Sequence, residues 1–271
     1  MTLPWDATSV IRDESDRFSH ALLGADPDSP VPTCPGWTVA DLAWHLTEVH
    51  LFWAAVLESG ATTDEHIEAI EAAKPARPAS LPEILDLRAA ATTRLLAALD
   101  QLDDSEARWT WSPQDQSVGF TRRMQTHEAT MHRIDAEQAA GADVSPIEPA
   151  VAAGAVTHAL DVMWHWIPEW GKAEVSSLVT VEATDTGDRW VAELGRWRGT
   201  GPESGTEFDE GFSRLSTARP APGAADLPHA SVTGTAVDLA RWMWGRGGQA
   251  EVRGEDAAVT AVGALVDQGM P

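Results

Sequence analysis

The chain has 271 residues, of which 43% are hydrophobic, enough for one large domain or two modest ones. It carries 42 acidic and 19 basic residues, for a formal net charge of −23, and this excess argues against binding to nucleic acid or to an anionic membrane surface. A single cysteine, Cys34, excludes an intramolecular disulfide and a cysteine-rich zinc site.

The N-terminal part of the chain predicts helices joined by proline-rich connections. Residues 5–23 place apolar side chains at helical spacing, and the turn-rich segment "GADPDSPVPTCPGW" follows. The next helix is expected to open at Thr38, because Asp41 three residues later completes a capping-box pattern. This helix continues through "VADLAWHLTEVHLFWAAVLES" and stops near Gly60.

Three further helices are predicted before residue 170, over residues 82–102, 119–140 and 147–167. Pro168 closes the last of them. Long helices with short or moderate connections are typical of an up-and-down bundle. We therefore expect a helical N-terminal domain over residues 1–170.

The pattern changes after about residue 172. The alternating runs "SSLVTVEAT" and "RWVAELGRW", separated by "DTGD", predict a β-hairpin, and "STARPAPGAADLP" predicts a loop. The segment "HASVTGTAVDLARWMWGRG" predicts a strand leading into a helix capped by Gly245 or Gly247, and "AEVRGEDAAVTAVGALVDQ" repeats that scheme. We expect a small α+β domain over residues 171–271.

The first residues show no basic start followed by an apolar run, so we do not expect a signal peptide. No stretch approaches the roughly 20 apolar residues that span a bilayer. The expectation is a cytoplasmic monomer or homodimer that binds small molecules and neither nucleic acid nor membrane.

The segment "HEATMHRID" carries the first candidate for chemistry. Glu128 and His132 are four residues apart and Asp135 follows three later, so a helix presents all three on one face. A carboxylate and an imidazole suit a divalent ion such as zinc, but two ligands do not complete a site. His45, on the apolar side of its own helix, is the best candidate for the third ligand.

Spacing alone leaves other interpretations open, namely a hydrogen-bonded core histidine or a solvated helix face. His158, Asp161 and His165 form a rival set on one helix face. His127 and His50 lie beside the favoured faces, where they support the site or reach the surface. Cys34 has no basic neighbour in the sequence and is expected to be a packed structural thiol.

Three segments resemble the mycothiol-dependent maleylpyruvate isomerase family, within the DinB-like superfamily of metal-binding four-helix bundles. They occur in the family's order: "TCPGWTVADLAWHL" (33–46), "RRMQTHEATMHRIDAE" (122–137) and "VTGTAVDLARWMWGRG" (232–247). The resemblance implies a DinB-like helical bundle that carries a zinc-type ion, followed by a small α+β domain of sterol-carrier-like fold. It assigns the metal ligands to His45, Glu128 and His132. The family's C-terminal arginine, which serves the thiol cofactor, falls on Arg246 or on nearby Arg241.

This resemblance implies an enzyme in which a divalent metal activates mycothiol as a nucleophile. The reaction is then either isomerisation of a maleylpyruvate-like substrate or transfer of the thiol to an electrophile. Arg246 is expected to hold a carboxylate in a bidentate fork, and Asp135 to orient a ligand imidazole. The alternatives are a zinc-dependent hydrolase or lyase that activates water, and a non-catalytic binding or regulatory module that the metal stabilises.

Overall fold

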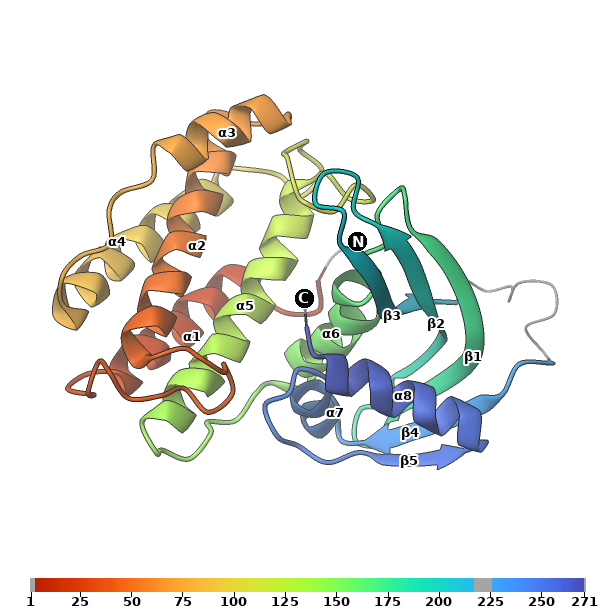
Figure 1. The fold of residues 1–271 in the computed structure, drawn as a ribbon. Coiled ribbons are helices and arrows are strands. Elements are labelled where there is room, and N and C mark those ends of the chain that lie inside the picture. The colour runs from red at the N-terminus through yellow and green to blue at the C-terminus, as the bar shows by residue number, and fades with distance from the viewer. Residues whose placement is uncertain (1–2, 217–225, 271) are drawn as a thin grey trace. The chain divides into compact units, whose positions relative to one another are not determined.

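A computed structural model describes residues 3–216 and 226–270 of the chain. The chain divides into two compact units, Met1–Pro146 and Ile147–Pro271, referred to below as the helical unit and the sheet unit (Figure 1). A helical N-terminal region followed by a mixed sheet confirms the predicted fold class.

The helical unit is built from four long helices and a short one. They are α1 (Ala7–Ala21), α2 (Val39–Ser59), α3 (Asp64–Ala72), α4 (Leu81–Asp100) and α5 (Val118–Ala139). Helix α2 packs against α4 and α1 against α5, with further contacts of α1 with α4 and of α2 with α5 (Figure 1). The sequence did not predict α3. This helix has no buried residue, so it lacks the apolar periodicity that marks a packed helix.

Part of the core of the helical unit joins α1, α2 and the start of α4. Phe18 on α1 and Leu22 at its C-cap pack with Leu42 and Leu46 on α2, and all four side chains are inaccessible to solvent. Ala136 on α5 belongs to the same cluster. This packing fixes α2 beside α5, which is the pair of helices that carries the predicted metal ligands.

The start of α2 is held by the predicted capping box. Thr38 is the N-cap, its hydroxyl accepts from the backbone N–H of Asp41, and the Asp41 carboxylate accepts from the backbone N–H of Thr38 at 2.9 Å. The pKa of Asp41 falls to about 2 because the Thr38 backbone and then Arg77 donate to its carboxylate. These hydrogen bonds stabilise the first turn of α2, which directly follows the segment that contains Thr33, Cys34 and Trp37.

Thr38→Ala is expected to lower the free energy of unfolding by about 1 kcal/mol, because the first turn of α2 loses its side-chain acceptor. Urea denaturation measures this change. Thr63→Ala is the matched control, because Thr63 caps α3 without a side-chain hydrogen bond, and it should change stability by less than about 0.5 kcal/mol. Equal losses in the two variants would contradict the capping assignment.

Among its described residues, the sheet unit contains five strands in the order β3-β2-β1-β4-β5. Its elements are α6 (Pro149–His158), the π-helix η1 (Ala159–Met163), β1 (Lys172–Ala183), β2 (Arg189–Thr200), β3 (Glu207–Leu215), β4 (His229–Gly234), α7 (Ala236–Met243), β5 (Glu251–Gly254) and α8 (Asp256–Gln268). Strands β1 and β2 form the predicted hairpin, β4 joins β1 in parallel, and α8 contacts every strand of the sheet.

The two compact units divide between Pro146 and Ile147, and a domain boundary near residue 170 stays a prediction. Helix α6 groups with the sheet unit because it packs against α7. Two indole N–H groups donate hydrogen bonds to α6. Trp190 donates to the Thr157 hydroxyl at 2.8 Å, and Trp244 donates to the Ala155 carbonyl at 3.1 Å. Most of the predicted loop over residues 216–228 lies outside the described residues.

In the described part of the chain, no helix has both the length and the apolar composition that a bilayer span requires.

Candidate metal centre

Helices α2 and α5 bring together the three predicted metal ligands. Nε2 of His45 lies 3.1 Å from Oε1 of Glu128, and Nε2 of His132 lies 3.3 Å from the same oxygen. One ligand atom from each of the three residues lies within 4.8 Å of the other two. Both histidines therefore direct a ring nitrogen at one carboxylate oxygen.

Local helix geometry explains the α5 half of this arrangement. Glu128 and His132 are four residues apart on α5, so their side chains lie on one face, one turn apart. His45 comes from the neighbouring helix α2, where the core packing holds its backbone. The side chain of His132 is 10% exposed and that of His45 is 35% exposed, so the centre is open to solvent on the His45 side.

The electrostatics of the centre favour a positive charge between the carboxylates. Burial opposes ionisation of Glu128, but hydrogen bonds from His132 and His45 outweigh it and hold the pKa of Glu128 well below its ordinary value. Burial also disfavours the charged form of His132, but contacts with Asp135, Cys34 and Glu128 outweigh it and raise the pKa of His132 well above its ordinary value. His132 thus lies between two carboxylates, Glu128 and Asp135, which favour the charged form of its ring.

Asp135 holds the second nitrogen of His132. Its Oδ2 lies 2.8 Å from Nδ1 of His132, and the Asp135 side chain is completely buried. The hydroxyl of Thr33 donates to Oδ1 at 2.5 Å, and the thiol of Cys34 donates to Oδ2 at 3.4 Å. Asp135 therefore fixes the ring of His132 and joins it to the loop before α2.

Trp37 forms an aromatic wall at the centre. Its ring centroid lies 4.8 Å from that of His45 and 6.2 Å from that of His132. The sequence did not predict a role for Trp37 or Thr33. Both lie in the short segment that leads into the predicted α2 N-cap, and this was the available signal, because that segment reaches the same end of the bundle as His45.

The two remaining histidines beside the site are both buried. His50 on α2 is inaccessible to solvent, with Nδ1 2.9 Å from Oγ1 of Thr92. His127 on α5 is 1% exposed, with its ring edge against Trp5. Neither belongs to a group of potential metal ligands among the described residues.

The neutrality of His50 predicts a pH-dependent stability. Burial, followed by the positive charge of Arg88, holds the pKa of His50 well below its ordinary value. The unfolded chain takes up a proton on this residue below about pH 6.5, whereas the native protein does not. The native state therefore loses stability as the pH falls, by up to about 1.4 kcal/mol per pH unit from this group.

Urea titrations of metal-free protein at about pH 6 and pH 5 check this expectation. Wild type should lose about 1 kcal/mol more than His50→Gln across that interval, because the variant has no imidazole to protonate in the unfolded state. Parallel losses in the two proteins would show that His50 does not carry the effect.

The three residues of the rival set do not form a group of potential ligands within the described part of the sheet unit, although Nδ1 of His165 lies 3.8 Å from Oδ1 of Asp161. His158 is buried and stacks on Trp244, whereas Asp161 is exposed and Nδ1 of His165 contacts the Asp161 backbone carbonyl at 3.2 Å. Within the described residues, the groups of potential metal ligands do not include this set. The π-helical turn of η1 replaces the regular helix that its spacing assumed.

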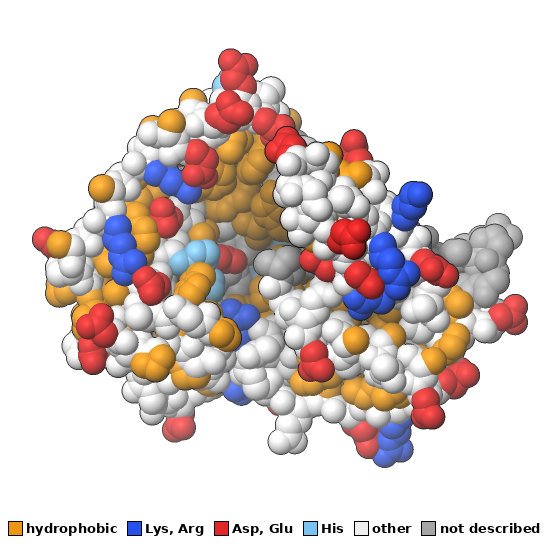
Figure 2. Space-filling model, viewed as in Figure 1, with side chains coloured by type: hydrophobic (Ala, Val, Ile, Leu, Met, Phe, Trp, Pro, Cys, Tyr) orange, Lys and Arg blue, Asp and Glu red, His pale blue; other side chains and the backbone are white. Residues whose placement is uncertain are grey.

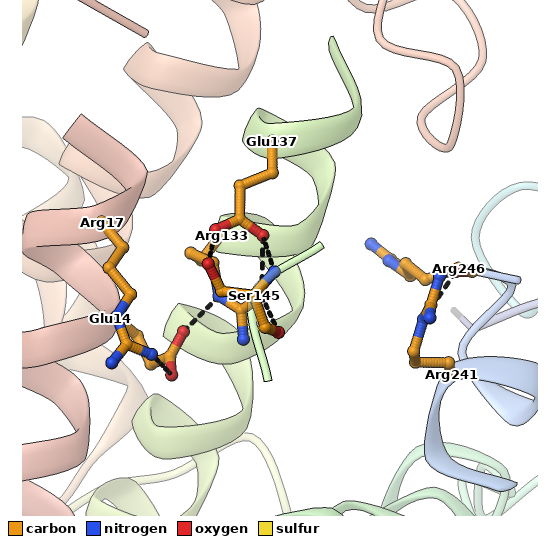
Figure 3. Close-up of polar contacts among 7 residues, drawn as sticks. All are labelled: Glu14, Arg17, Arg133, Glu137, Ser145, Arg241 and Arg246. Carbon is orange, nitrogen blue, oxygen red and sulfur yellow. Dashed lines mark hydrogen bonds and ion pairs between the residues drawn. The ribbon is translucent and has the colours of Figure 1, made fainter. Parts of the chain in front are cut away.

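The two candidate arginines lie at the end of α7 in the sheet unit. Arg241 donates from Nε and Nη2 to the carbonyl of Arg246, at 3.2 and 3.1 Å (Figure 3). Nη1 of Arg246 donates to the carbonyl of Trp244. The Arg241 guanidinium thus supports the turn that carries Arg246.

The acidic side chains on the surface agree with the excess of acidic residues in the sequence. Acidic side chains are scattered over the visible face, and histidine side chains reach the surface of the helical unit beside hydrophobic ones (Figure 2). A dispersed negative charge fits a solvated exterior with no single acidic patch on that face.

The donor set fits a divalent metal ion. Two imidazoles and one carboxylate are the ligands of many catalytic zinc sites, which keep one position open for water or substrate. The carboxylate–histidine contact through Asp135 is the usual support of such a ligand. A divalent cation at this position would also place a positive charge beside the Glu128 carboxylate, which the two histidines now hold in its ionised form.

Comparisons with known proteins identify related sequences and folds. Residues 9–137 match the family model described as the mycothiol maleylpyruvate isomerase N-terminal domain. Two solved structures share the fold, those of a mycothiol-dependent maleylpyruvate isomerase and of a histidine-to-alanine mutant of that enzyme. Each is 14% identical, covers 95% of this chain and 97% of the other, and has a TM-score of 0.57. No curated protein matches this chain.

Proposed function

Because residues 9–137 of this chain belong to the mycothiol maleylpyruvate isomerase N-terminal domain family, we propose that it is a metal-dependent enzyme that uses a low-molecular-weight thiol as its nucleophile. Mycothiol is the proposed thiol. The reaction is either isomerisation of a maleylpyruvate-like substrate or transfer of the thiol to an electrophile.

The observation that carries this proposal is the convergence of His45, Glu128 and His132, with His45 partly exposed. These residues are proposed to hold a zinc-type ion, which favours the thiolate form of a bound thiol over the neutral thiol. Asp135 keeps Nδ1 of His132 occupied, so that Nε2 is the ligand nitrogen. The Trp37 ring provides an apolar surface beside the open position.

The isomerase reaction follows from reversible addition of the thiolate. A bond forms between sulfur and one carbon of an activated cis double bond, and the electron pair of the double bond moves to the neighbouring carbonyl. Rotation about the resulting single bond and loss of the thiolate then give the trans product and return the thiol unchanged. In a transferase, the sulfur–carbon bond persists and a proton or a leaving group completes the balance.

An anionic substrate requires a local positive group, because the net charge of −23 repels it at long range. Arg246 is proposed to bind a carboxylate of the thiol or of its partner in a bidentate fork. Arg241 donates to the carbonyl of Arg246, so we assign the ligand contact to Arg246 and the support of its turn to Arg241.

Assays of the zinc-loaded protein with and without mycothiol, against a panel of electrophiles that includes maleylpyruvate, test the proposal. Turnover that depends on the thiol supports it. Turnover without thiol would instead indicate that the open position activates water, and inactivity against the whole panel would indicate a non-catalytic metal-stabilised module.

Arg246→Ala is expected to leave metal content unchanged and to lower thiol-dependent turnover by about 10- to 100-fold, the loss of about 1.5–3 kcal/mol in charge-assisted hydrogen bonds. Metal analysis and the thiol dependence of kcat/KM measure the two effects. Arg241→Ala is the comparison, with a smaller loss, because it disturbs only the support of the turn. Unchanged kinetics in Arg246→Ala would remove this residue from the mechanism.

A further inference from the structure

A second set of potential ligands shares His132 with the first. Cys34, His132 and Asp135 each offer a ligand atom, and these atoms lie within 4.8 Å of one another. His132 and Asp135 are buried and Cys34 is half-buried. The set uses the opposite ring nitrogen of His132 from the one that faces Glu128.

The contacts within this set resemble the spacing of ligands around one ion. A tetrahedral ion of the size of zinc, with bonds of about 2.0–2.3 Å, holds its ligand atoms about 3.3–3.8 Å apart, and a larger soft ion holds them further apart. Sγ of Cys34 lies 3.4 Å from Oδ2 of Asp135, and Nδ1 of His132 lies 2.8 Å from that oxygen, so the second pair must widen by at least about 0.5 Å to hold an ion. Thr33 donates to Oδ1 and keeps Oδ2 turned toward the other two ligands.

We propose that Cys34, His132 and Asp135 form a second metal site, selective for soft divalent ions of the cadmium type. The thiol and the Nδ1–H of His132 both direct their protons at Oδ2 of Asp135. Binding releases these two protons to solvent and places one divalent cation where they were. A thiolate ligand favours soft ions, whereas the first set contains only nitrogen and oxygen donors.

The two sites exclude each other because they share one imidazole. A neutral imidazole has a single ring nitrogen free to bind a metal, and the other nitrogen keeps its proton. When Nδ1 of His132 binds an ion, the proton remains on Nε2 and is directed at Glu128. The first set then loses one of its three ligands, so a soft ion displaces zinc from the centre. This inference depends on the geometry of His132 and not on the identity of the substrate.

Titration of the metal-free, full-length protein with Cd²⁺ tests the site, with the ultraviolet cadmium–thiolate absorption as the signal. Cys34 is the only cysteine, so the signal reports on this residue alone. Asp135→Asn and His132→Gln should weaken the Cd²⁺ affinity at least about tenfold. His45→Gln and Glu128→Gln should retain it, although both remove a ligand of the first set.

Three results would overturn the inference. The first is that wild type gives no cadmium–thiolate signal. The second is that Asp135→Asn binds Cd²⁺ as tightly as wild type, which would indicate adventitious binding to the thiol alone. The third is that His45→Gln loses the signal, which would indicate that Cys34 completes the first set instead. Circular dichroism of each variant verifies the fold. His45→Gln is expected to lack the proposed activity, so a cadmium–thiolate signal in this variant tests the second site independently of that activity.

Discussion

His45→Ala, Glu128→Gln and His132→Ala are each expected to remove most of the bound zinc and to lower thiol-dependent turnover by more than about 100-fold. Loss of a supporting residue around a metal costs about 10- to 100-fold, and the loss of one of three direct ligands costs more. Metal analysis after dialysis and kcat/KM with mycothiol measure the two losses. The two should fall together, because the same three side chains carry both.

Histidines outside the centre provide the controls. His158→Ala in the sheet unit and His66→Ala on the exposed side of α3 should both leave metal content near that of wild type, since neither belongs to a group of potential ligands in the described chain. Loss of metal in His158→Ala with retention in His45→Ala would move the site to the rival set on residues 158–165. Full metal content in all three ligand variants would refute the metal centre itself.

Arg133→Met is expected to destabilise the protein by about 3–5 kcal/mol, because it leaves buried carboxylates without their counter-ion. Arg133 on α5 is inaccessible to solvent. Its Nε donates to Glu14 on α1, and its Nη1 lies 2.8 Å from Glu137 and 2.9 Å from the Ser145 carbonyl (Figure 3). The network joins α1, α5 and the segment after α5, and urea denaturation measures its loss.

Two comparison variants isolate the buried charges as the cause. Arg17→Met removes an arginine that is 48% exposed and lies 3.3 Å from the same Glu14, and it should cost less than about 1 kcal/mol. The combined variant Glu14→Gln, Arg133→Met and Glu137→Gln should recover much of the stability that Arg133→Met loses, because no buried charge then lacks a partner. Equal losses in the single and combined variants would show that packing, and not charge, is responsible.

Local patterns predicted most helices because each depends on residues close in the chain. The capping pair Thr38 and Asp41 marked the start of α2, and the spacing of Glu128 and His132 placed both on one face of α5. The hairpin of β1 and β2 followed from two alternating runs and a short turn. The sequence did not predict helix α3 or strand β3. Helix α3 is exposed and therefore carries no core-facing pattern.

Sequence alone thus determined which residues of α2 and α5 can offer ligands, because helical periodicity depends only on neighbours along the chain. Only the tertiary structure decided that His45 meets Glu128, that Thr33 and Cys34 reach Asp135 across 102 and 101 positions, and that α6 packs with the sheet unit. Contacts between distant segments depend on how the helices pack, and spacing within one segment carries no information about its partner.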